Sequence, residues 1–244
     1  MKIYDVEDSG SYVNVGTYFR EDTELAAELG LVQSDLAGFI AIKDPYIAST
    51  LFQAEDINKR GRMFTMVRHP LDRVLSAFHY YAIANYEPEY DPELVHMSFE
   101  MYSKQNRTQH NYMVRTLSNA TITEELTENH LNLAKEILRK KCLIGLMSEK
   151  EHSMMRFKAY FGLTSTDDRT RACEERMHWD WTGKNIEKNK NELPDEGTPA
   201  WNILYEKNKF DMELYEYAKQ LFRQQSGLFH YHKDGYILGL SNQD

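Results

Sequence analysis

Residues 62–81, RMFTMVRHPLDRVLSAFHYY, are the part of this 244-residue chain that says most about its fold. They begin with Met63–Val67, a short run of apolar and β-forming residues that is typical of a buried strand. Pro70 then suits the first turn of a helix, where its missing N–H is not needed. The apolar residues that follow recur at helical spacing and share one face, namely Leu71, Val74, Leu75, Phe78 and Ala82. These residues therefore predict a strand, a turn and a helix.

Two polar side chains in these residues are placed to bind an anion. Arg68 follows the expected strand, and Ser76 lies about 200° around the helix from Val74, away from the apolar face. An arginine fork and a serine hydroxyl can both donate hydrogen bonds to phosphate, and a helix N-terminus favours negative charge. We therefore expect an anion site at the C-terminal edge of a parallel sheet, where such sheets bind ligands. In the alternative interpretation, Arg68 pairs with an acid such as Asp72, and Ser76 is a surface serine.

The rest of the chain alternates short apolar runs with helical patterns, which predicts an α/β fold with a parallel sheet and right-handed crossovers. Further strands are expected at residues 11–15, 37–42 and 142–146, and helices at 21–29, 45–54, 98–117 with a break near Asn106, 128–141, 149–161 and 211–223. Asp211 is expected to cap the last helix. The polar residues 163–200 suggest a long loop, and the residues from Gly227 onward suggest a solvated tail.

Composition limits the classes of function. The net charge of −9 argues against general nucleic-acid binding, which needs a basic footprint. No run of residues is long and apolar enough to span a membrane. Two sequons, at Asn106 and Asn119, are compatible with a secreted protein but also arise by chance. The two cysteines, Cys142 and Cys173, leave the redox compartment open.

The motif FTMVRHPLDRVLSAF, residues 64–78, resembles the 3′-phosphate-binding motif of sulfotransferases that use 3′-phosphoadenosine 5′-phosphosulfate (PAPS). Their pattern is an apolar strand followed by R-x-P-x-x-R-x-x-S and an aromatic position, matched here by Arg68, Pro70, Arg73, Ser76 and Phe78. The resemblance implies that Arg68 and Ser76 bind the 3′-phosphate of PAPS, with Arg73 supporting that site or pairing with an acid. It also implies a P-loop-like three-layer fold, in which helices flank a central parallel sheet.

Other residues resemble the Golgi-type sulfotransferases that act on carbohydrate. Residues 133–149 resemble a helix, a strand and the start of an acidic helix in that family, and residues 208–218 resemble its terminal helix. Trp181–Lys184 lies where the family places a loop that covers the cofactor, which implies cofactor-binding roles for Thr182 and Lys184. The resemblance extends over roughly residues 10–225 and implies a Golgi or other secretory location, membrane attachment through an anchor outside this sequence, and glycosylation.

Two departures from the family pattern concern catalysis. The family's 5′-phosphosulfate loop carries Lys or Arg in a Gly/Ser/Thr turn, and residues 5–16 have no lysine or arginine. We therefore expect a truncated chain that lacks the first strand and this loop. Several relatives place a histidine base on the strand before the motif, and residues 38–42 contain none. The substitute bases are Asp44, which also suits a helix cap before Pro45, and His69, which also suits a packing role.

The sequence thus predicts a sulfotransferase-like domain over residues 1–225 and a tail over 226–244. Its expected activity is transfer of a sulfuryl group from PAPS to a hydroxyl, with a glycan as the expected acceptor and no metal or nucleic acid required. The alternative function is that of a non-catalytic relative, which keeps the fold and binds the nucleotide's 3′ end without transferring sulfate.

Overall fold

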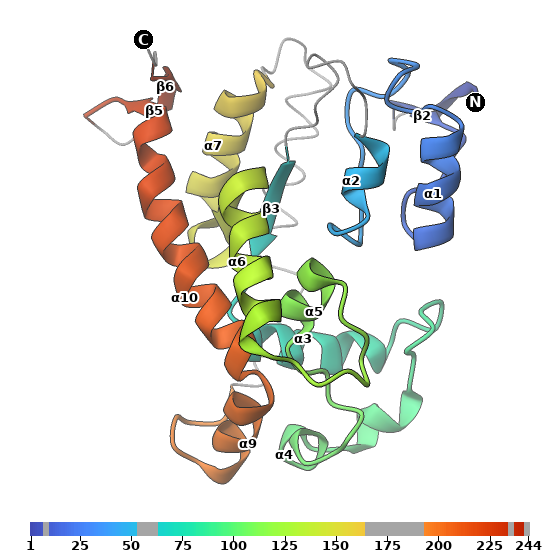
Figure 1. Ribbon diagram of the computed structural model, residues 1–244. Helices are drawn as coiled ribbons and strands as arrows, with labels where there is room; N and C mark the ends of the chain where they lie inside the picture. The colour runs from blue at the N-terminus through green and yellow to red at the C-terminus, as the bar shows by residue number, and fades with distance from the viewer. Residues whose placement is uncertain (7–9, 53–62, 164–192, 234–236, 242–244) are drawn as a thin grey trace. The chain divides into compact units, whose positions relative to one another are not determined.

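The computed structural model describes residues 1–6, 10–52, 63–163, 193–233 and 237–241. The chain, drawn as a ribbon in Figure 1, divides by its internal contacts into two compact units. Unit 1 comprises Met1–Met63 and Tyr112–Cys142, and unit 2 comprises Phe64–Asn111 and Leu143–Asp244. Within the described ranges, no helix combines the length and apolar character needed to cross a membrane.

Unit 1 begins with an antiparallel hairpin of β1 (Ile3–Val6) and β2 (Gly10–Val13), in which Ile3 pairs with Val13. The helix expected at residues 21–29 is present as α1 (Arg20–Glu28), and Gly30 follows it with a left-handed φ of 69°. Its buried side chains are Thr23 and Ala26, whereas Leu25 and Leu29 are exposed. The strand expected at residues 11–15 corresponds to β2, which pairs with the antiparallel strand β1 and not within a parallel sheet.

Residues 37–42 do not form the expected strand. Ala37, Ile40 and Ile42 pack against a small core made by α1 and α2 (Ala48–Leu51), while Phe39 is 67% exposed. A short apolar run shows that a segment is partly buried, but it does not show that a neighbouring strand will satisfy its backbone. Here the apolar side chains find helical partners, and the prediction of a strand was wrong.

The second part of unit 1 contains α5 (Tyr112–Ser118) and α6 (Glu128–Lys141), which pack against each other. The sequence predicts α6 with its observed bounds, and Leu131, Ala134 and Leu138 are its buried residues. Its last turn contains Arg139, Lys140 and Lys141, which suit the negative end of the helix dipole.

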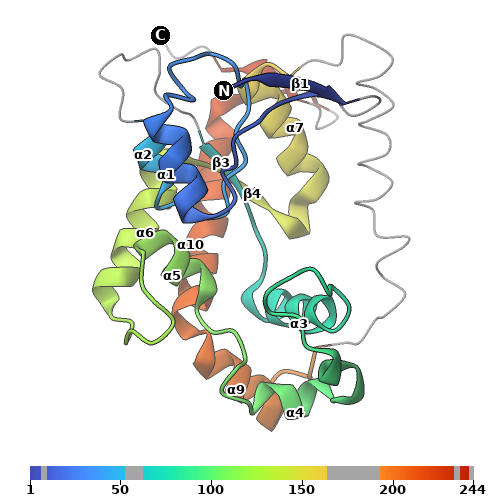
Figure 2. The ribbon, with the colours of Figure 1, turned by 90° about the vertical axis from the view of Figure 1, so that its right-hand side faces the viewer.

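Unit 2 contains the strand and helix expected from the motif. β3 (Met63–Val67) pairs with β4 (Cys142–Leu146) in a small parallel sheet, and both strands have the expected bounds. The chain passes from β3 directly to α3 (Pro70–Tyr81), as Figure 2 shows. After β4, a 3₁₀ turn η3 (Met147–Glu149) leads to α7 (Lys150–Phe161), whose Phe157 is fully buried.

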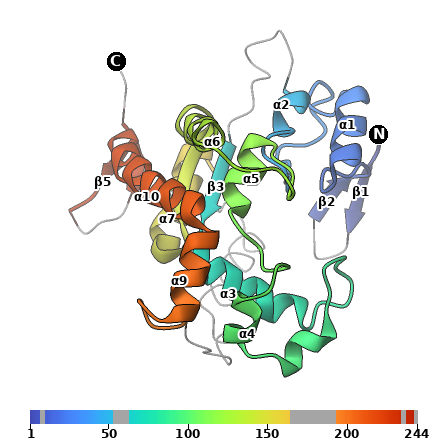
Figure 3. The same ribbon diagram turned by 60° about the horizontal axis from the view of Figure 1, so that its bottom comes forward.

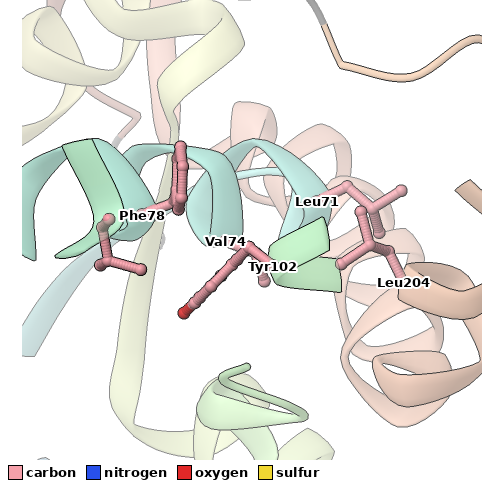
Figure 4. Packing of buried hydrophobic residues seen from close by; sticks show 6 residues of the cluster. Leu71, Val74, Phe78, Tyr102 and Leu204 are labelled. Carbon is pink, nitrogen blue, oxygen red and sulfur yellow. The ribbon is translucent and has the colours of Figure 1, made fainter. Parts of the chain in front are cut away.

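A helical core holds α3 in place. The 3₁₀ helix η2 (Pro92–His96) and α4 (Phe99–Ser103) pack beside α3, and α4 contacts α9 (Pro199–Lys207) (Figure 3). The break expected near Asn106 separates α4 from α5. Figure 4 shows how side chains from α3, α4 and α9 meet in this core, which consists of Leu71, Val74, Phe78, Leu94, Tyr102 and Leu204.

The C-terminal part differs from the prediction in three respects. Helix α9 begins in the last two residues of the expected loop and continues through residues for which no helix was expected; its N-cap is Thr198, whose hydroxyl accepts from the Trp201 N–H at 3.4 Å. Helix α10 (Lys209–Gln224) has Asn208 as its N-cap, so Asp211 is a buried first-turn residue and not the cap.

The third difference is that the described residues in the ranges 225–233 and 237–240 are not a solvated tail. They form the 3₁₀ helix η4 (Gln225–Leu228) and an antiparallel hairpin of β5 (Phe229–Tyr231) and β6 (Ile237–Leu240). Phe229 packs in a core cluster with Leu143 and Phe157. The hairpin is held by apolar contacts to elements far away in the sequence, which short-range patterns do not reveal.

Candidate functional site

The turn between β3 and α3 brings together the features expected of an anion site. Val67 is buried at the end of β3, and the half-buried Arg68 follows it. His69 is the N-cap of α3, with φ −53° and ψ 130°, and its side chain makes no capping hydrogen bond. Pro70 occupies the first turn, where no N–H is needed. Arg68 thus lies next to a helix N-terminus that no side chain of the described residues caps.

Arg68 has no protein anion as a partner within the described part of the chain. Asp72, the acid considered as its alternative partner, lies in the first turn of α3 and forms no ion pair with it. An arginine that is neither fully buried nor paired keeps its fork of donors available for an external anion. This arrangement is compatible with an anion site, and anion binding by Arg68 stays a prediction.

Ser76 lies on α3 away from the helix's most buried face, as expected. The buried residues of α3 are Pro70, Leu71, Val74 and Phe78, whereas Ser76 is half-buried. Its hydroxyl has no hydrogen-bond partner among the described residues. Ser76 is three residues beyond Arg73, a spacing that makes side chains neighbours on a helix surface.

Arg73 donates through Nη1 to Oε1 of Gln109 at 2.7 Å. The amide nitrogen Nε2 of Gln109 in turn donates to the Tyr81 hydroxyl at 2.9 Å. Arg73 is therefore held by an amide. The sequence suggested that Arg73 supports the phosphate site or pairs with an acid, and it did not suggest this contact. Gln109 could not be recognised from sequence, because it lies in no motif and its partner is 36 positions away.

The two substitute bases have structural contacts. His69 packs edge-on against Tyr215, with ring centroids 5.3 Å apart, and its Nδ1 is buried without a hydrogen-bond partner among the described residues. In unit 1, Asp44 accepts from the Tyr46 and Ile47 N–H groups at 3.0 and 3.4 Å and pairs with Arg20 at 2.9 Å. These contacts give both residues a structural role. A role for either of them as a base stays a prediction.

Thr182 and Lys184 lie outside the described residues. Two other arginines have structural partners, because Arg107 pairs with Asp91 and Arg115 donates to the carbonyl groups of Thr121 and Glu124. In the described ranges, His, Cys, Asp and Glu side chains form no group suited to holding a metal ion. Burial raises the pKa of the Cys142 thiol to about 12, which suits a packing role more than a reactive one.

Comparison with known proteins identifies the family. The sulfotransferase family model matches residues 43–218, which is well over half of the chain and includes the β3–α3 turn. The match begins later than the resemblance expected from about residue 10. No curated protein and no solved structure matches the chain significantly. On the strength of the family match, the chain belongs to the sulfotransferase family.

Proposed function

We propose that this protein is a PAPS-dependent sulfotransferase in which Arg68 and Ser76 bind the 3′-phosphate of the donor. The observation that carries the proposal is the position of Arg68, which follows β3, lies beside the α3 N-terminus and lacks a protein anion within the described residues. Helix N-termini and arginine forks both favour phosphate. Arg73, Thr182 and Lys184 are proposed as further donor-binding residues, and the complete fold as the three-layer α/β arrangement of the family.

In the proposed reaction, an acceptor hydroxyl oxygen attacks the sulfur atom of PAPS. The bond from sulfur to the bridging oxygen breaks, and adenosine 3′,5′-bisphosphate leaves while the hydroxyl loses its proton. Binding the 3′-phosphate positions the donor for this attack. Asp44 and His69 are the proposed acceptors of the proton, and the chemistry needs no metal ion.

A carbohydrate is the proposed acceptor, and the Golgi or another secretory compartment is the proposed location. Both rest on the similarity of residues 133–149 and 208–218 to carbohydrate sulfotransferases. Asn106 and Asn119 are both exposed, as a glycosylated side chain must be. Membrane attachment through an anchor outside the given sequence belongs to the same proposal.

A non-catalytic, nucleotide-binding relative is the second candidate function. It is favoured by residues 5–16, which contain no lysine or arginine to stabilise the leaving phosphate. The described residues at this end form the β1–β2 hairpin, not a strand that leads through a turn into a helix. Such a protein would bind adenosine 3′,5′-bisphosphate without transferring sulfate.

A transfer assay separates the two candidates. The protein is incubated with PAPS carrying a radiolabelled sulfuryl group and a mixture of unsulfated glycans, and label in the glycan fraction is counted. The enzyme transfers label, and Arg68→Ala and Ser76→Ala reduce this transfer strongly. Binding of the bisphosphate without any transfer supports the non-catalytic relative, and absence of both binding and transfer overturns the nucleotide site itself.

A further inference from the structure

We infer that Gln109 is a positioning residue, which holds the Arg73 side chain ready for the 3′-phosphate end of the nucleotide. The inference rests on the proposed nucleotide site and extends it to a residue outside the motif. Its basis is a chain of contacts within unit 2 that connects the junction of α9 and α10, through residues 102–111, to α3.

The first link is the side-chain amide of Gln109, which bridges two residues of α3. It accepts from Arg73 and donates to Tyr81. A guanidinium can only donate, so the amide oxygen must face Arg73, and the nitrogen is then left to face Tyr81. The bridge joins positions two turns apart on α3, and it fixes the orientation of the amide as well as its position.

The second link fixes the backbone on either side of this amide. Tyr102 is 3% exposed, and its backbone carbonyl accepts from the hydroxyl of Thr108, the residue just before Gln109. The Asn111 N–H donates to Oδ1 of Asn208 at 3.0 Å, and Oδ1 of Asn111 accepts from the Asp211 N–H at 3.1 Å. Asn208 and Asp211 are fully buried, so this end of the segment is anchored to the start of α10.

The backbone of Asn111 supports the same conclusion. Its φ of 47° lies in the left-handed region, which asparagine tolerates better than most residues. A conformation of this kind persists where the surroundings hold it in place. The contacts to Asn208 and Asp211 do so here, and they direct the chain so that Gln109 reaches α3.

The third link is the relation of Arg73 to the proposed phosphate site. Arg73 lies one turn into α3, five residues after Arg68 and three residues before Ser76. A long arginine side chain has many rotamers, and restricting it in advance reduces the entropy lost when it binds a ligand. Gln109 restricts Arg73 on the helix that supplies Ser76, and this is how it assists recognition of the 3′-phosphate.

The test compares two nucleotides by calorimetry at constant salt concentration. Adenosine 3′,5′-bisphosphate carries the 3′-phosphate and 5′-AMP lacks it, so the ratio of their affinities measures recognition of that group. Gln109→Leu, which keeps the side-chain size but removes the amide, should reduce the ratio about tenfold and leave the affinity for 5′-AMP unchanged. If Gln109 had a purely structural role, Gln109→Leu would lower the affinity for both nucleotides by the same factor, or would lower only the melting temperature.

Two further variants complete the design. Gln105→Leu makes the same substitution in the same segment, at a half-buried glutamine whose side chain has no hydrogen-bond partner among the described residues, and should leave the ratio unchanged. Arg73→Leu should reduce the ratio at least as much as Gln109→Leu. The double variant should lose no more than Arg73→Leu alone, because Gln109 acts through Arg73.

Each outcome decides a particular point. If the wild-type protein shows no preference for the bisphosphate, the proposed function fails, and the role of Gln109 fails with it. If the preference exists and Arg68→Ala removes it, the nucleotide site stands, and Gln109 is then tested separately. An unchanged ratio in Gln109→Leu, or additive losses in the double variant, overturns the positioning role.

Discussion

Arg156 places a positive charge in the interior of unit 2. Its side chain is 2% exposed, donates to the Phe222 carbonyl and to the Tyr231 hydroxyl, and lies 3.9 Å from the centre of the Phe222 ring. These contacts join α7 to the end of α10 and to the C-terminal hairpin. Removing a buried, hydrogen-bonded cation leaves its partners without donors and creates a cavity.

We therefore expect Arg156→Ala to reduce the free energy of unfolding by about 2–4 kcal/mol. Arg223→Ala is the matched control, because Arg223 is an exposed arginine of α10, and it should change stability by less than about 0.5 kcal/mol. Urea unfolding of both variants measures the difference. Equal stabilities of the two variants would contradict the structural role of Arg156.

The side chains of the candidate site differ in how well sequence could identify them. Arg68 and Ser76 follow from the motif, since a strand end and a helical spacing determine where they lie. Residue spacing alone does not determine whether Arg68 binds a phosphate or pairs with Asp72. Gln109 could not be found at all, because its role depends on a contact between segments that are distant in the sequence.

Strand β4 packs so closely against its neighbours that a side chain at Gly145 would force them to shift. A Cβ atom at Gly145 would come within 2.5 Å of Sδ of Met66 and of Cζ of Phe157, and within 3.0 Å of Cβ of Ser153. Ser153 is itself fixed, because its hydroxyl accepts from the Leu146 N–H at 2.9 Å. The strand therefore lies in direct contact with both β3 and α7.

Gly145→Ala should lower stability by about 1–3 kcal/mol, as overpacking of a dense core does. Gly227→Ala serves as the control, because a Cβ atom at Gly227 would meet nothing within 4 Å. Thermal unfolding followed by circular dichroism compares the two variants. A melting temperature for Gly145→Ala equal to that of Gly227→Ala would show that β4 is packed less tightly than the structure indicates.

Helices and strands were predictable where a local pattern matched their burial. Residues 63–67 and 142–146 are short apolar runs, and in both cases the neighbouring helical patterns also formed helices. Residues 37–42 have the same apolar character, but their side chains pack on α1 and α2 and no strand forms. Helix α9 was missed because Thr198 and Pro199, its N-terminal signals, lie at the end of a long polar segment.

His152 makes the stability of the protein depend on pH. Its ring packs edge-on against Phe222 and Tyr231, and its Nε2 is buried without a hydrogen-bond partner among the described residues. Burial is the main cause that lowers its pKa below 6.5, and the charge of Arg156 acts in the same direction while Glu149 opposes it. The unfolded chain therefore binds a proton more readily than the folded chain.

The sign of the effect follows from proton linkage. Stability should be greatest above the unfolded pKa of 6.5 and fall as the pH drops below it, because protons then favour the unfolded state. Burial also lowers the pKa of His79, which adds to the same trend. Melting temperatures of the wild type and His152→Phe, measured from about pH 7.5 to about pH 5.5, should diverge, with the variant losing less stability. Parallel curves would exclude this role for His152.

Contacts between distant parts of the chain, including the pairing of strands, were harder to predict than the individual helices and strands. A parallel sheet was expected, and β3 and β4 pair in parallel, but which strands would pair and the antiparallel hairpins at both ends were not predicted. The C-terminal hairpin depends on Phe229 packing with Leu143 and Phe157, and such contacts arise only once distant elements have formed. The family match over residues 43–218 then gives the chemistry that composition and charge could not supply.

Calorimetric titration with adenosine 3′,5′-bisphosphate tests the proposed nucleotide site most directly. The wild-type protein should bind in the micromolar range, and Arg68→Ala and Ser76→Ala should lose this binding while their melting temperatures stay unchanged, because neither side chain has a hydrogen-bond partner among the described residues. A folded wild-type protein that does not bind the bisphosphate, or variants that bind it as tightly as the wild type, would contradict the assignment of the β3–α3 turn as the 3′-phosphate site.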